Sequence, residues 1–327
     1  MDSRISSVLI EADQQARTRS LAVRRPAPGV LIANGATRLD LIQRLSTNEL
    51  MEMAEGEVRP TVLTTAIGRI VDRLHVLSLG DRLALITSPG RAETVLAWLR
   101  SHVFFQDDVT LARAFPEAEH WFLLGAQAAD QAAHTLEGSG KGPPRRARIL
   151  PEALVWPATP PEPIGVHLLL HPKAAAAFSS GLTGAVDSGL GEAVYQGLRV
   201  EAGYPEFGQD FDDRDIPLEV GLTHAVSFRK GCYLGQEIIA RMESRAKLPR
   251  RLVGARLAGP VRAPSDLMRA ARSVGRLTSA AFTPRLGWIG LAVVKGEALD
   301  EGVTADGASL QLVDLPFPQE EPSSRQV

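Results

Sequence analysis

The stretch from Thr61 to Gly90, TVLTTAIGRIVDRLHVLSLGDRLALITSPG, constrains the fold more than any other part of the chain. Its apolar and β-branched residues form three runs, separated only by the short turns at Gly68-Arg69 and Gly80-Asp81. Runs of this composition, broken by glycine-containing turns, predict three consecutive strands. A strand-after-strand order is typical of α+β proteins and argues against an alternating βαβ fold.

The elements on either side extend this α+β pattern. Before the three strands we expect a short buried strand at Gly29–Gly35 and a helix that begins near Thr37; after them we expect a helix at Ala92–His102, two more strands and a helix at Ala126–Leu136. The glycine- and proline-rich segment Gly138–Arg148 predicts an exposed loop or a boundary. From Arg251 onward, short strands separated by turn residues predict a small C-terminal β-barrel or sandwich.

Composition and charge exclude several classes of protein. The chain has 327 residues, 44% of them hydrophobic, which is typical of a globular protein with two or three domains. No run approaches the roughly 18 consecutive apolar residues of a transmembrane helix, so no membrane partner is expected. The N-terminus carries Asp2, Glu11 and Asp13 and lacks a targeting pattern, which favours the cytoplasm. A net charge of −2 gives no attraction to nucleic acid, so no direct nucleic-acid partner is expected.

Common catalytic and metal-binding motifs are missing from the sequence. It has no P-loop, no complete dinucleotide-binding glycine pattern and no G-x-S-x-G. His167 and His171 lack a nearby carboxylate or cysteine, so we interpret them as structural and expect no metal site. The basic residues between Arg241 and Arg251 are interrupted by Glu243, which favours a solvated face over an RNA site.

The segment RKGCYLGQE, Arg229 to Glu237, contains the only cysteine of the chain. A single cysteine permits no internal disulfide, which fits a reducing compartment. Arg229, Lys230 and the start of a predicted helix would lower the pKa of the Cys232 thiol and make it reactive. The alternative is that Cys232 is a small, buried apolar side chain, and the residues alone leave both interpretations open.

Several motifs resemble one known family. KGCYLGQE resembles the signature of the folate-binding YgfZ family, a branch of the aminomethyltransferase (glycine-cleavage T-protein) superfamily that is tied to iron–sulfur protein maintenance. LSTNEL at Leu45–Leu50, GRIVD at Gly68–Asp72 and LRVEAGYPEFGQDF at Leu198–Phe211 resemble further family segments in the expected order. The resemblance covers roughly Gly29 to Leu315.

The resemblance implies a tetrahydrofolate cofactor and roles for individual residues. Glu201 matches the carboxylate that accepts hydrogen bonds from the pterin, although by position alone it is a surface glutamate near a helix end. Asp72 matches the acidic residue near the reacting folate nitrogens; its alternative is an ordinary hairpin aspartate. Cys232 and Asp72 are the candidate catalytic residues. Lys230 or Arg229 is the candidate cation for the carboxylate tail of the folate.

The resemblance also implies a three-lobed ring with a ligand in its central opening. We expect a flexible segment at 1–25 and a discontinuous folate-binding domain made of 26–50 and 150–247. A ferredoxin-like domain at 51–149, a C-terminal β-barrel at 248–315 and a disordered tail at 316–327 complete the expected division.

Three hypotheses for the function follow from the resemblance. The first is a monomeric accessory protein that binds reduced folate and supports iron–sulfur cluster assembly or repair in client enzymes, including those that modify tRNA. The second is a folate-dependent aminomethyltransferase or demethylase that produces methylene-tetrahydrofolate. True T-proteins lack the cysteine-containing signature and are longer, which favours the first hypothesis over the second. The third is a non-catalytic scaffold without a ligand.

Overall fold

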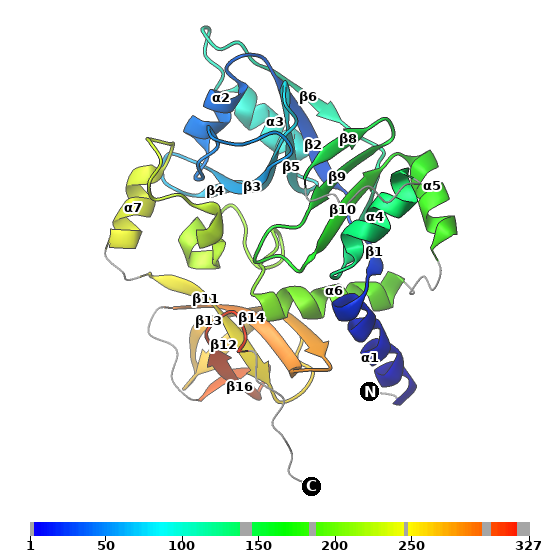
Figure 1. Cartoon of the computed structure of the whole chain (residues 1–327). Helices are drawn as coiled ribbons and strands as arrows, with labels where there is room; N and C mark the ends of the chain where they lie inside the picture. Colours follow the sequence, from blue (N-terminus) through cyan, green and yellow to red (C-terminus); the bar gives the residue numbers. More distant parts are fainter. Residues whose placement is uncertain (1–2, 138–145, 183–187, 245–247, 296–301, 319–327) are drawn as a thin grey trace.

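The computed structural model describes residues 3–137, 146–182, 188–244, 248–295 and 302–318. Figure 1 shows three lobes around a centre: a sheet with two helices at the top, a second sheet with two helices at the right, and a barrel at the bottom. The predicted α+β class and the C-terminal barrel are confirmed. Most of the expected loop at Gly138–Arg148 lies outside the described residues.

The first sheet has the strand order β3-β4-β5-β2-β6. Its strands are β2 (Pro28–Asn34), β3 (Val58–Thr64), β4 (Ile70–Ser78), β5 (Arg82–Pro89) and β6 (Thr110–Ala114). The three strands predicted between Thr61 and Gly90 are β3, β4 and β5, and φ is +72° at Gly68 and +80° at Gly80, where the two turns need the left-handed conformation. The helices α2 (Arg38–Leu45) and α3 (Ala92–Arg100) pack together on one face of this sheet.

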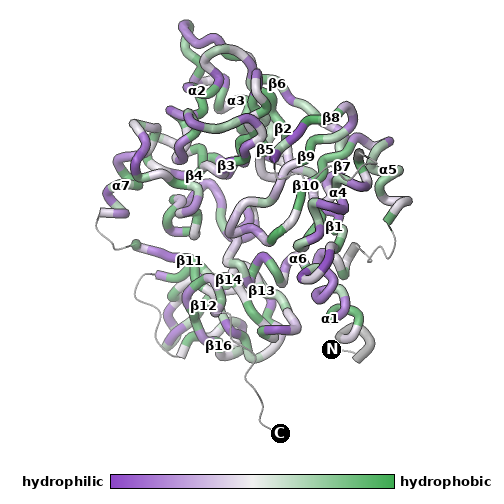
Figure 2. The backbone as a smooth tube through the Cα atoms, in the orientation of Figure 1, coloured by the Kyte–Doolittle hydropathy of each residue, from purple (hydrophilic) through white to green (hydrophobic). Residues whose placement is uncertain are grey.

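The second sheet has the order β1-β7-β10-β9-β8. Its strands are β1 (Leu21–Arg25), β7 (Glu119–Leu124), β8 (Arg148–Leu150), β9 (Ala153–Pro157) and β10 (Gly165–Leu170). The helices α4 (Ala128–Glu137) and α5 (Pro172–Gly181) cover its outer face. Its inner face packs on the first sheet, because Leu154, Trp156 and Leu169 share one buried cluster with Val30 and Leu77. The hydrophobic strands at this junction are green in Figure 2.

The third lobe is a closed barrel with the order β11-β14-β13-β12-β15-β16. Its strands are β11 (Arg250–Leu257), β12 (Ser265–Arg269), β13 (Arg272–Thr283), β14 (Gly287–Lys295), β15 (Val303–Ala305) and β16 (Ala308–Val313). The helix α6 (Ser188–Ala202) lies between this barrel and β1 of the second sheet. A Cβ at Gly197 would lie 2.8 Å from Cγ2 of Thr283, so glycine permits the close approach of α6 and β13.

The segment between α6 and the barrel forms two short 3₁₀ helices and one α-helix. These are η1 (Pro217–Val220), η2 (Leu222–Ala225) and α7 (Gln236–Ser244). Among the helices of the described residues, none combines the length and apolar character needed to cross a lipid bilayer.

The N-terminal segment is structured, which corrects the expectation of a flexible 1–25. Residues Ser3–Thr18 form the helix α1, and β1 pairs antiparallel with β7. Leu9, Ala12 and Ala16 repeat at helical spacing and are buried in one cluster with Val194 and Tyr195 of α6. The start of the expected disordered tail, 316–327, is also wrong, because Phe317 is buried, with only 2% exposure.

The sheet pairing differs from the expected division of the chain. The expected discontinuous domain joins 26–50 with 150–247, but β2, which lies within 26–50, pairs with β5 and β6 of the first sheet. The expected ferredoxin-like unit at 51–149 is split, because β6 lies in the first sheet and β7 pairs with β10 in the second. These pairings join strands far apart in the sequence, and such strands carry no local signal of their partner.

Candidate ligand-binding site

The loop that carries Cys232 is fixed on the first lobe, and Cys232 itself is exposed. The N–H of Leu234 donates to the carbonyl of Arg44 at 3.0 Å, and the hydroxyl of Thr64 donates to the carbonyl of Leu234 at 2.6 Å. A Cβ at Gly235 would lie 2.5 Å from the carbonyl oxygen of Thr65, so only glycine fits there. The loop is thereby docked on the β3–β4 hairpin.

Lys230 is buried and has a structural position. Its Nζ donates to the backbone carbonyls of Gln43, Ser46 and Asn48 at 2.6, 2.7 and 2.8 Å, next to the C-terminal end of α2. Burial lowers the pKa of Lys230 to about 8. An ammonium group has three N–H donors, and all three are used here. This geometry leaves no donor of Lys230 for a folate tail; its neighbour Arg229 is exposed.

Asp72 is fully buried at 0% exposure on β4. One carboxylate oxygen accepts the backbone N–H of Arg73 at 2.9 Å, and the other accepts the backbone N–H of Ser88 at 3.0 Å. Burial nevertheless raises the pKa of Asp72 to about 6, because the charged form loses its hydration. Asp72 therefore lies next to Ser88, with a carboxyl group that is harder to ionise than an exposed one.

Glu201 lies on α6 with both carboxylate oxygens held by arginines. Oε1 accepts from Nη2 of Arg17 on α1, and Oε2 accepts from Nη2 of Arg285, each at 2.9 Å. Burial alone would raise the pKa of Glu201, but the hydrogen bonds and charges of these arginines hold it below its usual value. Glu201 lines a pocket of about 440 Å³, which we call the Glu201 pocket, together with Arg17, Leu198, Arg285 and Phe317.

A second, smaller space lies where both sheets meet α6 and the loop after it, and we call it the polar cavity. It is lined by Arg25, Pro26, Pro28, Arg73, His75, Ile86, Thr87, Ser88, Pro89, His120, Phe122, Trp156, Glu162, His167, Tyr195, Tyr204 and Glu206. Its water-accessible volume of about 80 Å³ is room for roughly five to eight water molecules. Glu162 lines both the polar cavity and the Glu201 pocket.

The structure does not bring Cys232, Asp72 and Glu201 around one cavity. Glu201 lines the Glu201 pocket, and Asp72 lies behind Ser88 at the polar cavity. Cys232 lines neither of these two spaces. The three residues lie on separate lobes or loops, and their convergence on one opening remains without support in the described residues.

Two histidines connect the polar cavity to a backbone carbonyl. Nδ1 of His120 lies 3.1 Å from the carbonyl oxygen of Pro26, and Nε2 of His120 lies 3.0 Å from Nδ1 of His167. A carbonyl only accepts, so Nδ1 of His120 carries the proton. Burial lowers the pKa of His120 to about 3, so the ring is neutral and its Nε2 accepts from Nδ1 of His167.

Glu162 lies close to the other end of this pair of histidines. Its Oε1 is 3.2 Å from Nε2 of His167. Burial would raise the pKa of Glu162, but the charges of His167, His75 and Arg73 lower it to about 2, which favours the ionised carboxylate. Phe122 and Trp156 stack on the His167 ring, with centroids 4.2 and 4.8 Å away, and fix its orientation.

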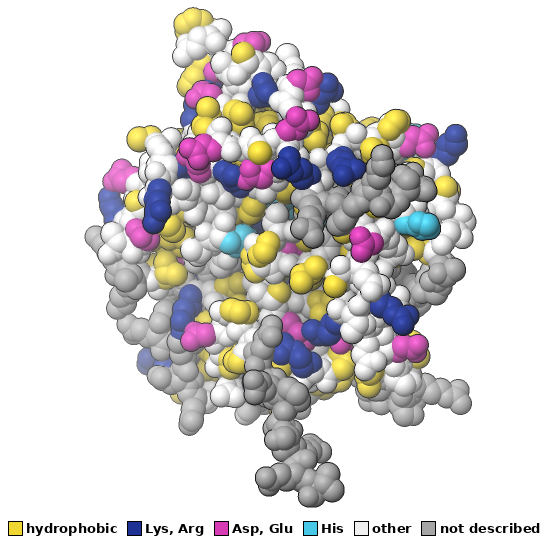
Figure 3. Space-filling model, viewed as in Figure 1, with side chains coloured by type: hydrophobic (Ala, Val, Ile, Leu, Met, Phe, Trp, Pro, Cys, Tyr) yellow, Lys and Arg dark blue, Asp and Glu magenta, His cyan; other side chains and the backbone are white. Residues whose placement is uncertain are grey.

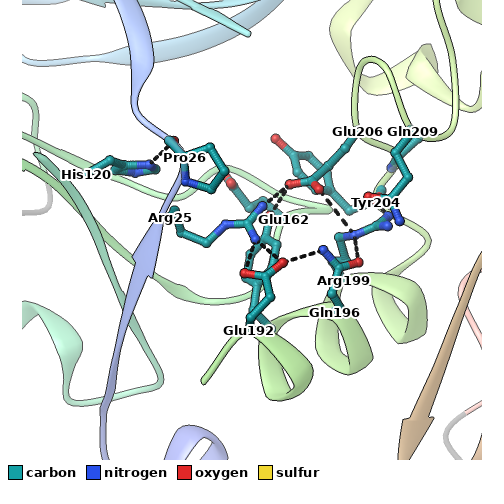
Figure 4. Close-up of polar contacts among 12 residues, drawn as sticks. Arg25, Pro26, His120, Glu162, Glu192, Gln196, Arg199, Tyr204, Glu206 and Gln209 are labelled. Carbon is teal, nitrogen blue, oxygen red and sulfur yellow. Dashed lines mark hydrogen bonds and ion pairs between the residues drawn. The ribbon is translucent and has the colours of Figure 1, made fainter. Parts of the chain in front are cut away.

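Arginine and glutamate side chains close the other side of the polar cavity. Arg25 reaches from β1 to Glu192 and Glu206, as Figure 4 shows, and its guanidinium lies 3.7 Å from the centroid of the Tyr195 ring. The hydroxyl of Tyr195 donates to Oε1 of Glu206 at 2.8 Å. The positive charge of Arg25 is thus paired with the negative charges of Glu192 and Glu206, and these ion pairs link β1 to α6 and to the loop after it.

Several polar atoms of cavity-lining residues have no hydrogen-bond partner among the described residues. They are Oε2 of Glu162, Oγ of Ser88, Nε2 of His167, the hydroxyl of Tyr204 and Nε1 of Trp156. Glu162, Tyr204 and Trp156 are only 8%, 1% and 1% exposed. Buried polar atoms are normally paired, and an unpaired one costs about 1–3 kcal/mol. A molecule with polar groups, water or a ligand, is therefore expected in the polar cavity.

Sequence reasoning missed Glu162 entirely and interpreted His167 as structural. Glu162 stands in TPPEPIG, where the flanking prolines indicate an exposed turn. Its burial follows from the contact between lobes, which no local pattern reveals. Among the described residues, no group of three or more His, Cys, Asp or Glu side chains is arranged to hold a metal ion. On the face in Figure 3, positive and negative side chains are intermixed.

Comparison with known proteins gives the fold. The chain is 28% identical to the aminomethyltransferase of Geobacillus kaustophilus over 333 residues, covering 95% of this chain and 90% of that protein. The crystal structure of glycine cleavage system aminomethyltransferase T from Bartonella henselae matches with a TM-score of 0.81 at 21% identity, covering 95% and 89%. The chain has the fold of aminomethyltransferase T.

Two further comparisons set the limits of this similarity. A chloroplastic protein of Arabidopsis thaliana is 25% identical over 282 residues, which are 84% of this chain but 65%, less than two thirds, of that protein. No protein-family model matches the chain. The predicted resemblance therefore holds for the aminomethyltransferase superfamily, and the YgfZ branch remains a prediction.

Proposed function

We propose that this protein binds a reduced folate, tetrahydrofolate or a derivative, between its lobes. One observation carries the proposal: the chain is similar to aminomethyltransferases over almost its whole length, and it has a pocket of about 440 Å³ beside the carboxylate of Glu201. A pterin presents neighbouring N–H donors, which a carboxylate accepts in charge-assisted hydrogen bonds. The exposed Arg229 is the remaining candidate from the signature for the folate tail.

In this proposal the protein is a cytoplasmic, monomeric accessory factor that supports iron–sulfur cluster assembly or repair. Its clients would include enzymes that modify tRNA. The support is the KGCYLGQE signature together with the exposure of Cys232, whose thiol is open to a partner protein. The docking of this loop on the β3–β4 hairpin links it to the strand that carries Asp72.

A second candidate function is folate-dependent aminomethyl transfer. The curated relatives named aminomethyltransferases favour it, as does the buried Asp72 beside the polar cavity. In such a reaction the carboxylate of Asp72 would stabilise positive charge that develops on the folate nitrogens. Incubation with tetrahydrofolate and an aminomethyl-lipoyl carrier separates the two candidates, since only the transferase would form methylene-tetrahydrofolate above background.

Isothermal titration calorimetry with tetrahydrofolate tests the folate proposal. We expect a dissociation constant of about 1 μM or lower, which corresponds to about −8 kcal/mol or stronger. Absence of binding at a tetrahydrofolate concentration about a hundred times this dissociation constant would contradict the proposal and favour the hypothesis of a scaffold without a ligand.

The accessory role is tested in cells from which the wild-type protein has been deleted and in which the Cys232→Ala variant is expressed instead. We expect loss of activity of iron–sulfur client enzymes while the variant keeps its unfolding midpoint. Gly231→Ala is the matched control, because a Cβ at Gly231 meets no atom within 4 Å, so this neighbouring change should support the clients fully. Full client activity with Cys232→Ala would remove the thiol from the proposal.

A further inference from the structure

Glu201 and Glu162 both lie between the lobes, but their carboxylate oxygens differ in how many hydrogen bonds they already accept. Each oxygen of Glu201 already accepts a hydrogen bond from a guanidinium group at 2.9 Å. A ligand would have to displace Arg17 or Arg285, and breaking one member of a buried ion pair costs several kcal/mol. Glu201 therefore meets a ligand as part of an arginine–carboxylate cluster.

Glu162 has the opposite arrangement. Its Oε1 lies against His167, whereas its Oε2 has no hydrogen-bond partner among the described residues. Nε2 of His75 lies 4.0 Å from Oε2, which is beyond hydrogen-bond distance. A buried carboxylate oxygen without a donor among the described residues is therefore available in the polar cavity, which Tyr204 also lines.

We propose that Glu162, rather than Glu201, is the carboxylate that accepts the N–H groups of a heterocyclic ligand in this protein. The inference rests on the proposed folate function and names the atom that binds the pterin end. His167 lies 3.2 Å from Oε1 of Glu162, and His120 lies 3.0 Å from the other nitrogen of His167, so both histidines are positioning residues for this carboxylate.

The lining of the polar cavity specifies the class of ligand. Phe122, Trp156 and Tyr204 line the cavity with aromatic carbon atoms, which give apolar contacts to a heterocycle. Arg25 of the same lining is already paired with Glu192 and Glu206, so the cavity offers no unpaired arginine charge from that side. A neutral ring with amide or amino N–H donors, such as the reduced pterin, fits this lining.

Calorimetry on three variants tests the assignment. The ligands are tetrahydrofolate and 6-methyltetrahydropterin, which has the same donors but no tail. For Glu162→Gln we expect at least a tenfold increase in the dissociation constant of both ligands, and for Glu201→Gln less than a threefold increase. Glu219→Gln is the matched control, since Glu219 is also buried and paired with an arginine, Arg250, but lines neither the polar cavity nor the Glu201 pocket, and it should bind as the wild type does.

The outcomes separate the inference from the proposed function. Loss of binding in Glu201→Gln with normal binding in Glu162→Gln overturns the inference and leaves folate binding intact. A wild-type protein that binds neither ligand overturns both. If Glu162→Gln does not fold, Tyr204→Phe takes its place, because it removes only the unpaired hydroxyl of Tyr204, which lines the same cavity as Glu162. We expect it to weaken binding of 6-methyltetrahydropterin at least threefold, and unchanged binding would contradict the assignment.

Discussion

Lys230 provides a direct test of whether the signature segment is partly structural. Substitution Lys230→Met keeps the length of the side chain and removes all three N–H donors. The carbonyls of Gln43, Ser46 and Asn48 then lose the group that holds the Cys232 loop to the end of α2. We expect the variant to lose stability and to keep folate affinity.

The size of the effect follows from the three hydrogen bonds. A buried acceptor that loses its partner costs about 1–3 kcal/mol, so three carbonyls give about 3–9 kcal/mol. Water molecules can replace some of the lost hydrogen bonds at the edge of the loop. Removing the ammonium group also removes the cost of burying its charge, a cost that lowers its pKa to about 8. We therefore expect a loss near the lower end, about 3 kcal/mol.

Chemical denaturation measures this loss. The unfolding of the wild type, Lys230→Met and Arg229→Met is monitored by far-ultraviolet circular dichroism. Arg229 is the matched control because it is the exposed neighbour on the same loop, and we expect less than about 0.5 kcal/mol for it. Normal stability of Lys230→Met combined with a large loss of folate affinity would refute the structural role and restore Lys230 as the cation for the folate tail.

Further predictions concern pH, packing and the N-terminal helix. Burial lowers the pKa of His75 and His120 to about 3 and that of His224 to about 4, so the stability that these neutral rings provide is complete above the unfolded pKa near 6.5 and is lost as the pH falls. Asp72, with its pKa raised to about 6, acts in the opposite direction between about 4 and 6, so the net difference is about two protons. The unfolding free energy should therefore drop by roughly 2–3 kcal/mol between pH 6 and 5, and a constant value would contradict the assigned protonation. Gly197→Leu should destabilise the protein by about 1–3 kcal/mol in thermal unfolding, because the new side chain meets Thr283, whereas Gly259→Ala in open space should be neutral. Arg17→Met should increase proteolysis of α1, since it removes the ion pair to Glu201; an unchanged cleavage rate would show that the apolar contacts of α1 suffice.

The sequence predicted those elements whose signals are local. Turn glycines at Gly68 and Gly80 located three strands, and short alternating runs after Arg251 located the barrel. The pairing of β2 with β6 could not be predicted, because it depends on contacts between distant segments. The same limit explains why α1 was expected to be loose: its apolar residues Leu9, Ala12 and Ala16 have little to bury until α6 is in place.

The candidate site shows the same limit in its chemistry. Asp72 and Glu201 are predicted as site residues because they stand in recognisable motifs, and the structure adds that Glu201 is enclosed by Arg17 and Arg285. Lys230 belongs to the most specific motif of the chain, yet its donors serve the backbone. Glu162 has no motif; only the assembled lobes show that it is buried and has an unpaired oxygen.

A crystal structure of the protein grown with tetrahydrofolate tests the central claim most directly. The account predicts electron density for the pterin in the polar cavity, with a ring N–H within hydrogen-bond distance of Oε2 of Glu162. Electron density for the pterin at Glu201, or at any other site away from Glu162, with the polar cavity filled only by water, would contradict the account.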